Sequence, residues 1–158
     1  MKSGADISEC GLYRYRLWRR WGRGDSVLWI MLNPSTADAE QDDPTIRRCV
    51  SFAESWGCGG IEVVNLFALR ATDPKELKAA VDPVGPRNDD ILLSRAEAKH
   101  RYIIAAWGAH GKLLEREKQV VELLAGMDLY CLGLTKAGYP RHPLYLPKKA
   151  EPTIWEAE

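Results

Sequence analysis

The hydrophobic pattern of the chain predicts an alternation of buried strands and helices. Four mostly apolar runs have the length of strands, and they cover residues 27–32, 61–67, 102–107 and 129–132. The segments between and before these runs predict helices over residues 43–56, 73–81, 87–99 and 109–125. Apolar strands that alternate with helices are typical of a parallel sheet covered on both faces.

Residues 12–21 predict one further strand, and the turn at 22–25 connects it to residues 27–32 as a hairpin. Two helix starts carry clear signals, because Asp43 and Asp73 are each followed by a proline. The predicted fold class is therefore α/β, as a single domain over residues 1–158. We expect a three-layer α/β/α arrangement, in which a four-stranded, mostly parallel central sheet carries an N-terminal antiparallel edge strand.

Composition is that of an ordinary globular protein. Of 158 residues, 46% are hydrophobic and 28% are charged, and 22 basic residues balance 22 acidic ones. Zero net charge argues against a protein held on nucleic acid by bulk charge alone. The four cysteines form no C-x-x-C pair, which disfavours a metal site. With no recognisable signal peptide and no apolar run of about 18 residues, we expect a soluble cytoplasmic protein without membrane contact.

One segment departs from this balance. Residues 13–24 contain five arginines and no acidic residue, with tyrosines and tryptophans between the arginines. A protein that binds a nucleic-acid strand uses cationic side chains to contact the phosphates and aromatic rings to stack on the bases. The alternative interpretation is an edge strand whose arginines face water and prevent aggregation. The sequence leaves both interpretations open.

Polar residues follow the predicted core strands, where open α/β sheets bind ligands. Asn33 is either a turn former before Pro34 or an amide that holds a water molecule or ligand. Asn65 either caps the next segment or contacts an amide-like edge, such as that of a pyrimidine, through donor and acceptor together. His110 is either a structural residue at a helix start or part of the site. His142 lies in a loop, where a functional role is more natural.

An acidic loop contains Asp38, Asp42 and Asp43, which form either a solvated stretch or a source of carboxylates for a metal or a water molecule. The phosphate-loop, dinucleotide-binding and nucleophile-elbow motifs are missing. ATPase, dinucleotide-dependent oxidoreductase and α/β-hydrolase functions are therefore disfavoured, and no cofactor is expected.

Several of these segments together resemble a bacterial family, domain-of-unknown-function family 1643, from Leu28 to Trp155. The hallmark segments are 31–38 (MLNPSTAD), 65–68 (NLFA), 70–74 (RATDP), 106–111 (AWGAHG) and 140–145 (PRHPLY). This resemblance does not by itself assign an activity to the chain.

More distantly, the order of motifs is similar to that of the uracil-DNA glycosylase superfamily. The segment 31–34 (MLNP) resembles its water-activating Asn-Pro-Gly motif, with Ser35 in place of the glycine. Asn65 lies where uracil-specific members place the asparagine that reads the base. The segment 107–112 (WGAHGK) is similar to a Trp-Gly-Ser-His-Ala stretch. The segment 142–144 (HPL) resembles the His-Pro-Ser motif, with Leu144 in place of the serine.

The second resemblance implies a DNA glycosylase that hydrolyses the N-glycosidic bond of a uracil-like or modified base. Asn33 would position the water with Pro34 fixing its geometry, Asn65 would read the base, and His142 would stabilise the leaving base. Either Phe52 or Tyr145 would stack on the extruded base. The remaining substrate contacts that it implies are Ser35, Trp107, His110 and Arg141.

Two other hypotheses stay open. The first is a non-catalytic nucleotide- or nucleic-acid-binding module on the same fold. The second is a metal-dependent hydrolase using the three aspartates of the acidic loop with His142, which is disfavoured because no metal-ligand spacing is present. The expected partner is DNA or a nucleotide, and a monomer is favoured.

Overall fold

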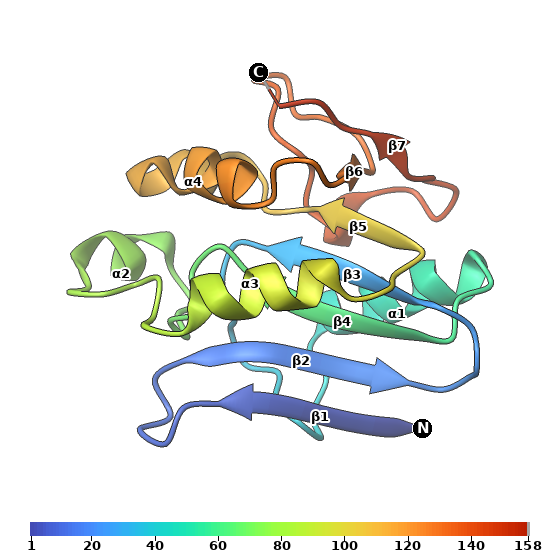
Figure 1. The fold of residues 1–158 in the computed structure, drawn as a ribbon, viewed down its shortest axis with the longest axis horizontal. Helices are drawn as coiled ribbons and strands as arrows, with labels where there is room; N and C mark the ends of the chain where they lie inside the picture. Colours follow the sequence, from blue (N-terminus) through green and yellow to red (C-terminus); the bar gives the residue numbers. More distant parts are fainter. Residues whose placement is uncertain (158) are drawn as a thin grey trace.

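A computed structural model describes residues 1–157, which form a seven-stranded mixed sheet and four α-helices (Figure 1). The spatial order of the strands is β1-β2-β4-β3-β5-β6-β7. Their bounds are β1 Lys2–Ile7, β2 Arg14–Arg20, β3 Ser26–Met31, β4 Gly60–Asn65, β5 Tyr102–Ala105, β6 Tyr130–Cys131 and β7 Thr153–Ile154. The helices are α1 Pro44–Ser55, α2 Pro74–Ala79, α3 Asn88–Glu97 and α4 Arg116–Leu123.

The centre of the sheet is parallel, as the apolar strands predicted. β3 pairs in parallel with β4 on one side and with β5 on the other, and β6 continues the parallel set beyond β5. In this register Met31 lies opposite Asn65, so β3 and β4 end side by side. The polar residues that follow the core strands are thereby brought together at the carboxyl ends of the parallel strands.

The predicted hairpin between residues 12–21 and 27–32 is wrong. β2 pairs antiparallel with β4, with Leu17 opposite Val63, and β3 lies on the other side of β4. The connecting turn crosses the start of β4 in very close contact, because a Cβ on Gly59 would lie 2.6 Å from the backbone nitrogen of Gly24. Glycine at this crossing lets the chain pass over β4.

The edges of the sheet carry two strands that were not predicted. β1 pairs antiparallel with β2 along its whole length, and β7 pairs antiparallel with β6. Both strands are partly or fully exposed, so their sequences lack the apolar runs that mark the centre. As a result β2 is not the edge strand that the sequence predicted.

Two helix starts are confirmed. Asp43 caps α1 by accepting a hydrogen bond from the backbone N–H of Ile46, and Asp73 caps α2 in the same way through Lys75. The predicted helix over 109–125 is instead a 3-10 helix, Ala109–Glu115, followed by α4. Leu114 and Glu115 adopt positive φ angles of 54° and 57°, and a left-handed backbone cannot continue an α-helix.

The helices cover both faces of the sheet (Figure 1). α1 packs on one face over a core that includes Trp29 and Val63, while α2, α3 and α4 pack on the other over Leu28 and Val64. Alternation of neighbouring strand residues between the two cores follows from the two-residue period of a strand. No helix in residues 1–157 is both long and apolar enough to cross a membrane.

Candidate functional site

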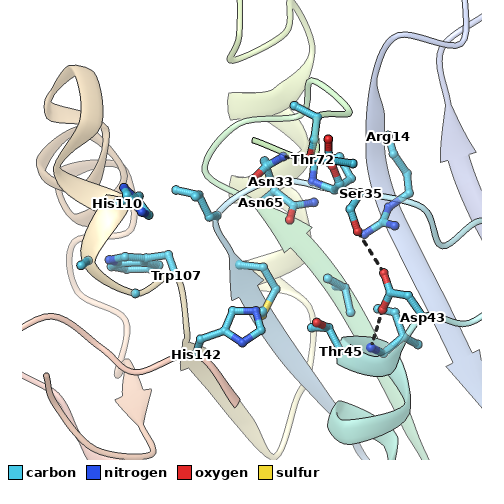
Figure 2. A pocket seen from close by; sticks show the side chains of 18 residues that line it. Arg14, Asn33, Ser35, Asp43, Thr45, Asn65, Thr72, Trp107, His110 and His142 are labelled. Atoms are coloured by element: carbon cyan, nitrogen blue, oxygen red, sulfur yellow. Dashed lines mark hydrogen bonds between the residues drawn. The ribbon is translucent and has the colours of Figure 1, made fainter. Parts of the chain in front are cut away.

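A cavity of about 340 Å³ opens at the carboxyl ends of the central strands β3, β4 and β5 (Figure 2). Backbone segments that follow these strands form most of its wall, and the first residue of β2 completes it. The residues that line it are Arg14, Met31, Leu32, Asn33, Pro34, Ser35, Asp43, Thr45, Ile46, Val63, Asn65, Ala71, Thr72, Trp107, Gly108, Ala109, His110 and His142.

Three side chains that the sequence singled out, Asn33, Asn65 and His142, meet in this cavity. They come from the ends of two neighbouring strands and from a loop near the C-terminus, up to 109 positions apart in the chain. Figure 2 shows the two asparagines close to one another, with His142 on the far side of the hollow. The parallel pairing of β3 with β4 is what juxtaposes the asparagines.

Asn65 is buried without hydrogen-bond partners for its side chain. It is only 1% exposed, and neither Nδ2 nor Oδ1 has a partner within residues 1–157. Its backbone is held firmly, because the side chain of Asn88 donates to its carbonyl oxygen at 2.9 Å. An unpartnered buried amide costs about 1–3 kcal/mol. Such a group in a cavity is ready to pair with a ligand.

The amide of Asn33 is fixed in orientation. Its Nδ2 donates to the carbonyl oxygen of Ala71 at 2.7 Å and to that of Pro34 at 3.0 Å. Both N–H groups are thereby used, so the side-chain oxygen remains as an acceptor. The same loop is anchored by the backbone N–H of Ala71, which donates to Pro34 at 3.0 Å.

His142 presents a defined tautomer. Its Nδ1 accepts a hydrogen bond from the backbone N–H of Leu144 at 3.2 Å, so in the neutral ring the proton lies on Nε2. Burial lowers the pKa of the imidazole, and the charge of Asp43 opposes this shift only in part. The ring is therefore neutral at pH 7, and its Nε2–H is the group with which it can donate a hydrogen bond.

Trp107 and His110 form the wall opposite the asparagines. Trp107 is 2% exposed and its indole N–H donates to Glu117 at 2.9 Å. The turn that follows packs directly on this ring, because a Cβ on Gly111 would lie 2.2 Å from Trp107 Cδ1. Gly108 ties the wall to the segment before His142 by donating to the carbonyl oxygen of Pro140 at 2.8 Å.

Two charged residues of the cavity were not predicted as binding residues. Arg14 enters from β2, whose antiparallel direction places its first residue at the edge where the parallel strands end. For Asp43 the sequence predicts a helix cap, and its loop is interpreted as a solvated stretch or as a source of carboxylates for a metal or a water molecule. In the structure Asp43 lines the cavity and also accepts from Ser35 Oγ at 3.2 Å. The antiparallel direction that the sequence predicts for residues 12–21 places Arg14 at this end of the sheet, but only the pairing of β2 with β4 brings it to the cavity.

Three predicted contacts lie outside the cavity lining. Phe52 was expected to stack on an extruded base, but its ring is 2% exposed and packs in the core, stacked on Trp56 at 5.5 Å. Tyr145, the other candidate for stacking, is 82% exposed on the surface. Arg141 is also exposed. Pro34, Ser35 and His110 do line the cavity.

The acidic loop is engaged in local structure. Asp38 accepts from the backbone N–H groups of Glu40 and Gln41, and Asp42 pairs with Arg19 at 2.8 Å. Asp43 caps α1. Within the described residues, no group of three or more histidine, cysteine, aspartate or glutamate side chains is arranged to hold a metal ion.

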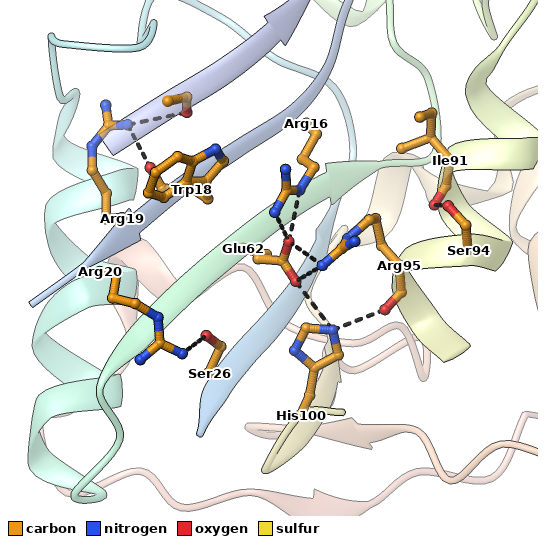
Figure 3. Close-up of polar contacts among 11 residues, drawn as sticks. Arg16, Trp18, Arg19, Arg20, Ser26, Glu62, Ile91, Ser94, Arg95 and His100 are labelled. Carbon is orange, nitrogen blue, oxygen red and sulfur yellow. Dashed lines mark hydrogen bonds and ion pairs between the residues drawn. The ribbon is translucent and has the colours of Figure 1, made fainter. Parts of the chain in front are cut away.

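Most arginines of the basic segment are committed to contacts within the fold (Figure 3). Arg16 pairs with Glu62, which also binds Arg95 and lies 3.2 Å from His100 Nε2. Arg19 is buried beside Asp42, and Arg20 donates to the carbonyl oxygens of Gly22 and Gly24. These arginines neither line the outermost strand nor form an open row of cations.

A comparison with known protein families identifies the family of this chain. The model of DUF1643, described as a protein of unknown function, matches residues 14–144. The chain belongs to the DUF1643 family. The matched segment begins at Arg14 and includes His142, so it contains every residue that lines the cavity. No curated protein and no solved structure matches the chain at a significant level.

Proposed function

We propose that this DUF1643 protein is a DNA glycosylase, related to the uracil-DNA glycosylase superfamily, that hydrolyses the N-glycosidic bond of a uracil-like or modified base. The observation that carries this proposal is the unpartnered amide of Asn65, held in a cavity with Asn33 and His142. The cavity volume of about 340 Å³ lies at the lower end of the range for small-ligand sites and suits one flat heterocycle.

Base recognition is assigned to Asn65. A side-chain amide offers one donor and one acceptor side by side, which matches the alternating carbonyl and N–H groups of a uracil edge. Trp107 lines the cavity and Phe52 does not, so the stacking role is assigned to the Trp107 ring. A base reaches such a site only after it leaves the helical stack.

The chemical step is assigned to Asn33 and His142. Asn33 Oδ1 accepts a hydrogen bond from a water molecule and directs its oxygen toward C1′ of the sugar. The C1′–N bond breaks with its electron pair moving to the base, the water oxygen bonds to C1′, and the released proton ends on the base. His142 Nε2–H donates to the departing anion. An amide is a weak base, so the rate depends on positioning and electrostatics.

Release of free base from oligonucleotides tests the proposal. Single- and double-stranded substrates containing uracil or modified pyrimidines are incubated with the wild-type protein and with Asn33→Ala, and free base is quantified. We expect release by the wild type and loss of release in Asn33→Ala with binding retained. Unchanged release in the variant refutes the role of Asn33.

A second candidate is a non-catalytic nucleotide-binding module that uses the same cavity. The observation in its favour is that Asp43, the carboxylate that lines the cavity, is engaged by Ile46 and Ser35 rather than free to act as a base. Binding without base release across the full panel of modified bases would favour this candidate over the glycosylase.

A further inference from the structure

Arg14 is a buried cation whose hydrogen-bonding capacity is largely unused. The residue is 3% exposed, its Nη1 donates to the carbonyl oxygen of Ala37 at 2.9 Å, and its Nε has no partner within the described residues. No carboxylate of residues 1–157 lies within ion-pair distance of it. The side chain nevertheless lines the cavity that contains Asn65.

Burial of this charge is costly. Moving a guanidinium out of water costs several kcal/mol, and one hydrogen bond to a neutral carbonyl does not recover that cost. Burial lowers the pKa of Arg14 to about 10, although the nearby charge of Asp43 opposes the shift. Arg14 therefore remains a cation at pH 7 and lacks a direct anionic partner.

The protein itself does not supply that partner. Asp43 and Asp38 are nearby carboxylates, but neither pairs with Arg14. Oδ1 of Asp43 caps α1 and its Oδ2 accepts from Ser35. Oδ1 of Asp38 accepts from the backbone N–H groups of Glu40 and Gln41. The bond to Ala37 fixes the loop after β3, yet a neutral donor would serve that purpose without the cost of a buried charge. Figure 2 shows the Arg14 side chain extending from β2 toward the part of the cavity where Ser35 and Asp43 lie.

We propose that Arg14 is an oxyanion-binding residue of the cavity, so that the ligand read by Asn65 carries a carboxylate on its ring or a phosphate on its sugar. A guanidinium presents its donors as a planar fork that matches both groups. The proposal rests on the proposed function in using the same base-sized cavity. It deepens that function by assigning a charge to the ligand.

Equilibrium binding to probes that differ in charge tests this inference. The probes are uracil and deoxyuridine as neutral ligands, orotate for the ring carboxylate, dUMP for the phosphate, and inorganic phosphate alone. We expect the wild type to bind orotate or dUMP roughly tenfold more tightly than its neutral counterpart, as for a charge-assisted hydrogen bond. Whichever probe shows the preference identifies the source of the oxyanion.

Two variants assign the preference to Arg14. Arg14→Met removes the charge, and we expect it to abolish the preference for anions by weakening the binding of orotate or dUMP about tenfold more than the binding of the neutral probes. Arg14→Lys keeps the charge without the fork and should retain only part of the preference. Equal loss of neutral and anionic binding in Arg14→Met, or a wild type without preference, overturns the inference.

Failure of this inference is distinguishable from failure of the proposed function. If neutral bases do not bind but phosphate binds through Arg14, the base-binding function fails and the oxyanion site stands. If bases bind through Asn65 and the protein prefers no anion, the base-binding function stands and the oxyanion site fails. Should Arg14→Met not fold, the Nε–H resonance of Arg14 in the wild type decides, because an anion bound there must shift it and a neutral probe must not.

Discussion

The side-chain amide of Asn88 donates to the backbone carbonyl oxygen of Asn65 at 2.9 Å and to that of Leu66 at 3.1 Å. Asn88 is the first residue of α3 and is fully buried. This helix therefore holds the end of β4 in place, while the side chain of Asn65 remains without partners in the cavity. Asn88 thus supports the end of β4, whereas the side-chain amide of Asn65 takes no part in the hydrogen bonding of the fold.

Replacement of Asn88 should therefore destabilise the fold. Asn88→Ala removes both hydrogen bonds and leaves the Asn65 carbonyl oxygen unsatisfied, so we expect a loss of about 2 kcal/mol in the free energy of unfolding. Denaturant unfolding followed by circular dichroism measures the change. A variant as stable as the wild type would show that α3 does not support β4 in this way.

Replacement of Asn65 should have the opposite effect on stability. Asn65→Ala removes an amide that has no partner, so we expect the free energy of unfolding to stay unchanged or to rise by about 1 kcal/mol. Ligand binding should be lost in the same variant. A marked loss of stability would mean that the amide is satisfied within the fold and is not reserved for a ligand.

The ion-pair network around Glu62 predicts a pH-dependent stability. Burial alone would raise the pKa of Glu62, but hydrogen bonds from Arg95 and Arg16 outweigh burial and lower it. The stabilisation is thus complete above the unfolded carboxyl pKa of about 4.3 and is lost as pH falls through the lower folded value. Glu62→Gln should cost about 2 kcal/mol at pH 7 and progressively less as pH falls below about 4.3.

Unfolding of wild type and Glu62→Gln across this pH range checks the prediction. Asp6→Asn is a matched control, because it breaks the exposed pair with Arg87 and should change stability by less than about 1 kcal/mol. If the difference in the free energy of unfolding between wild type and Glu62→Gln does not decrease at acidic pH, the assigned role of the carboxylate is contradicted.

His142 should be neutral at pH 7 with its proton on Nε2. Burial lowers the pKa of the ring, so we expect a titration midpoint below the usual value of about 6.5. The contribution of His142 to stability is present above that usual value and is lost as pH falls through the lower folded pKa. Long-range ¹⁵N–¹H NMR reports both tautomer and midpoint, with His142→Gln to assign the signals. A proton on Nδ1 would exclude the proposed donor role of Nε2.

Gly111 should be intolerant of a side chain. In Gly111→Ala the new Cβ would lie 2.2 Å from Trp107 Cδ1, so the indole must shift, and we expect this shift to disturb its hydrogen bond to Glu117. We expect a loss of about 1–3 kcal/mol in stability and weaker ligand binding. Gly22→Ala is the control, since its Cβ would make an ordinary contact at 3.5 Å. An unmoved Trp107 Nε1–H resonance in Gly111→Ala would contradict this expectation.

Much of the framework follows from the sequence because it depends on local chemistry and periodicity. Apolar runs alternating with helices specify parallel strands, and aspartate before proline specifies the starts of α1 and α2. Because the carboxyl ends of parallel strands lie at the same end of a sheet, the residues that follow these strands can be expected to lie close together from the sequence alone. Asn33 and Asn65 were therefore within reach of sequence reasoning.

Other features were decided only by the tertiary structure. The sequence could not specify that β2 pairs with β4 instead of β3, because strand pairing depends on a crossing of glycines distant in the chain. That pairing places Arg14 in the cavity, and core packing buries Phe52 away from it. Partner choice and side-chain direction are set by non-local packing, which leaves no periodic signal in the sequence.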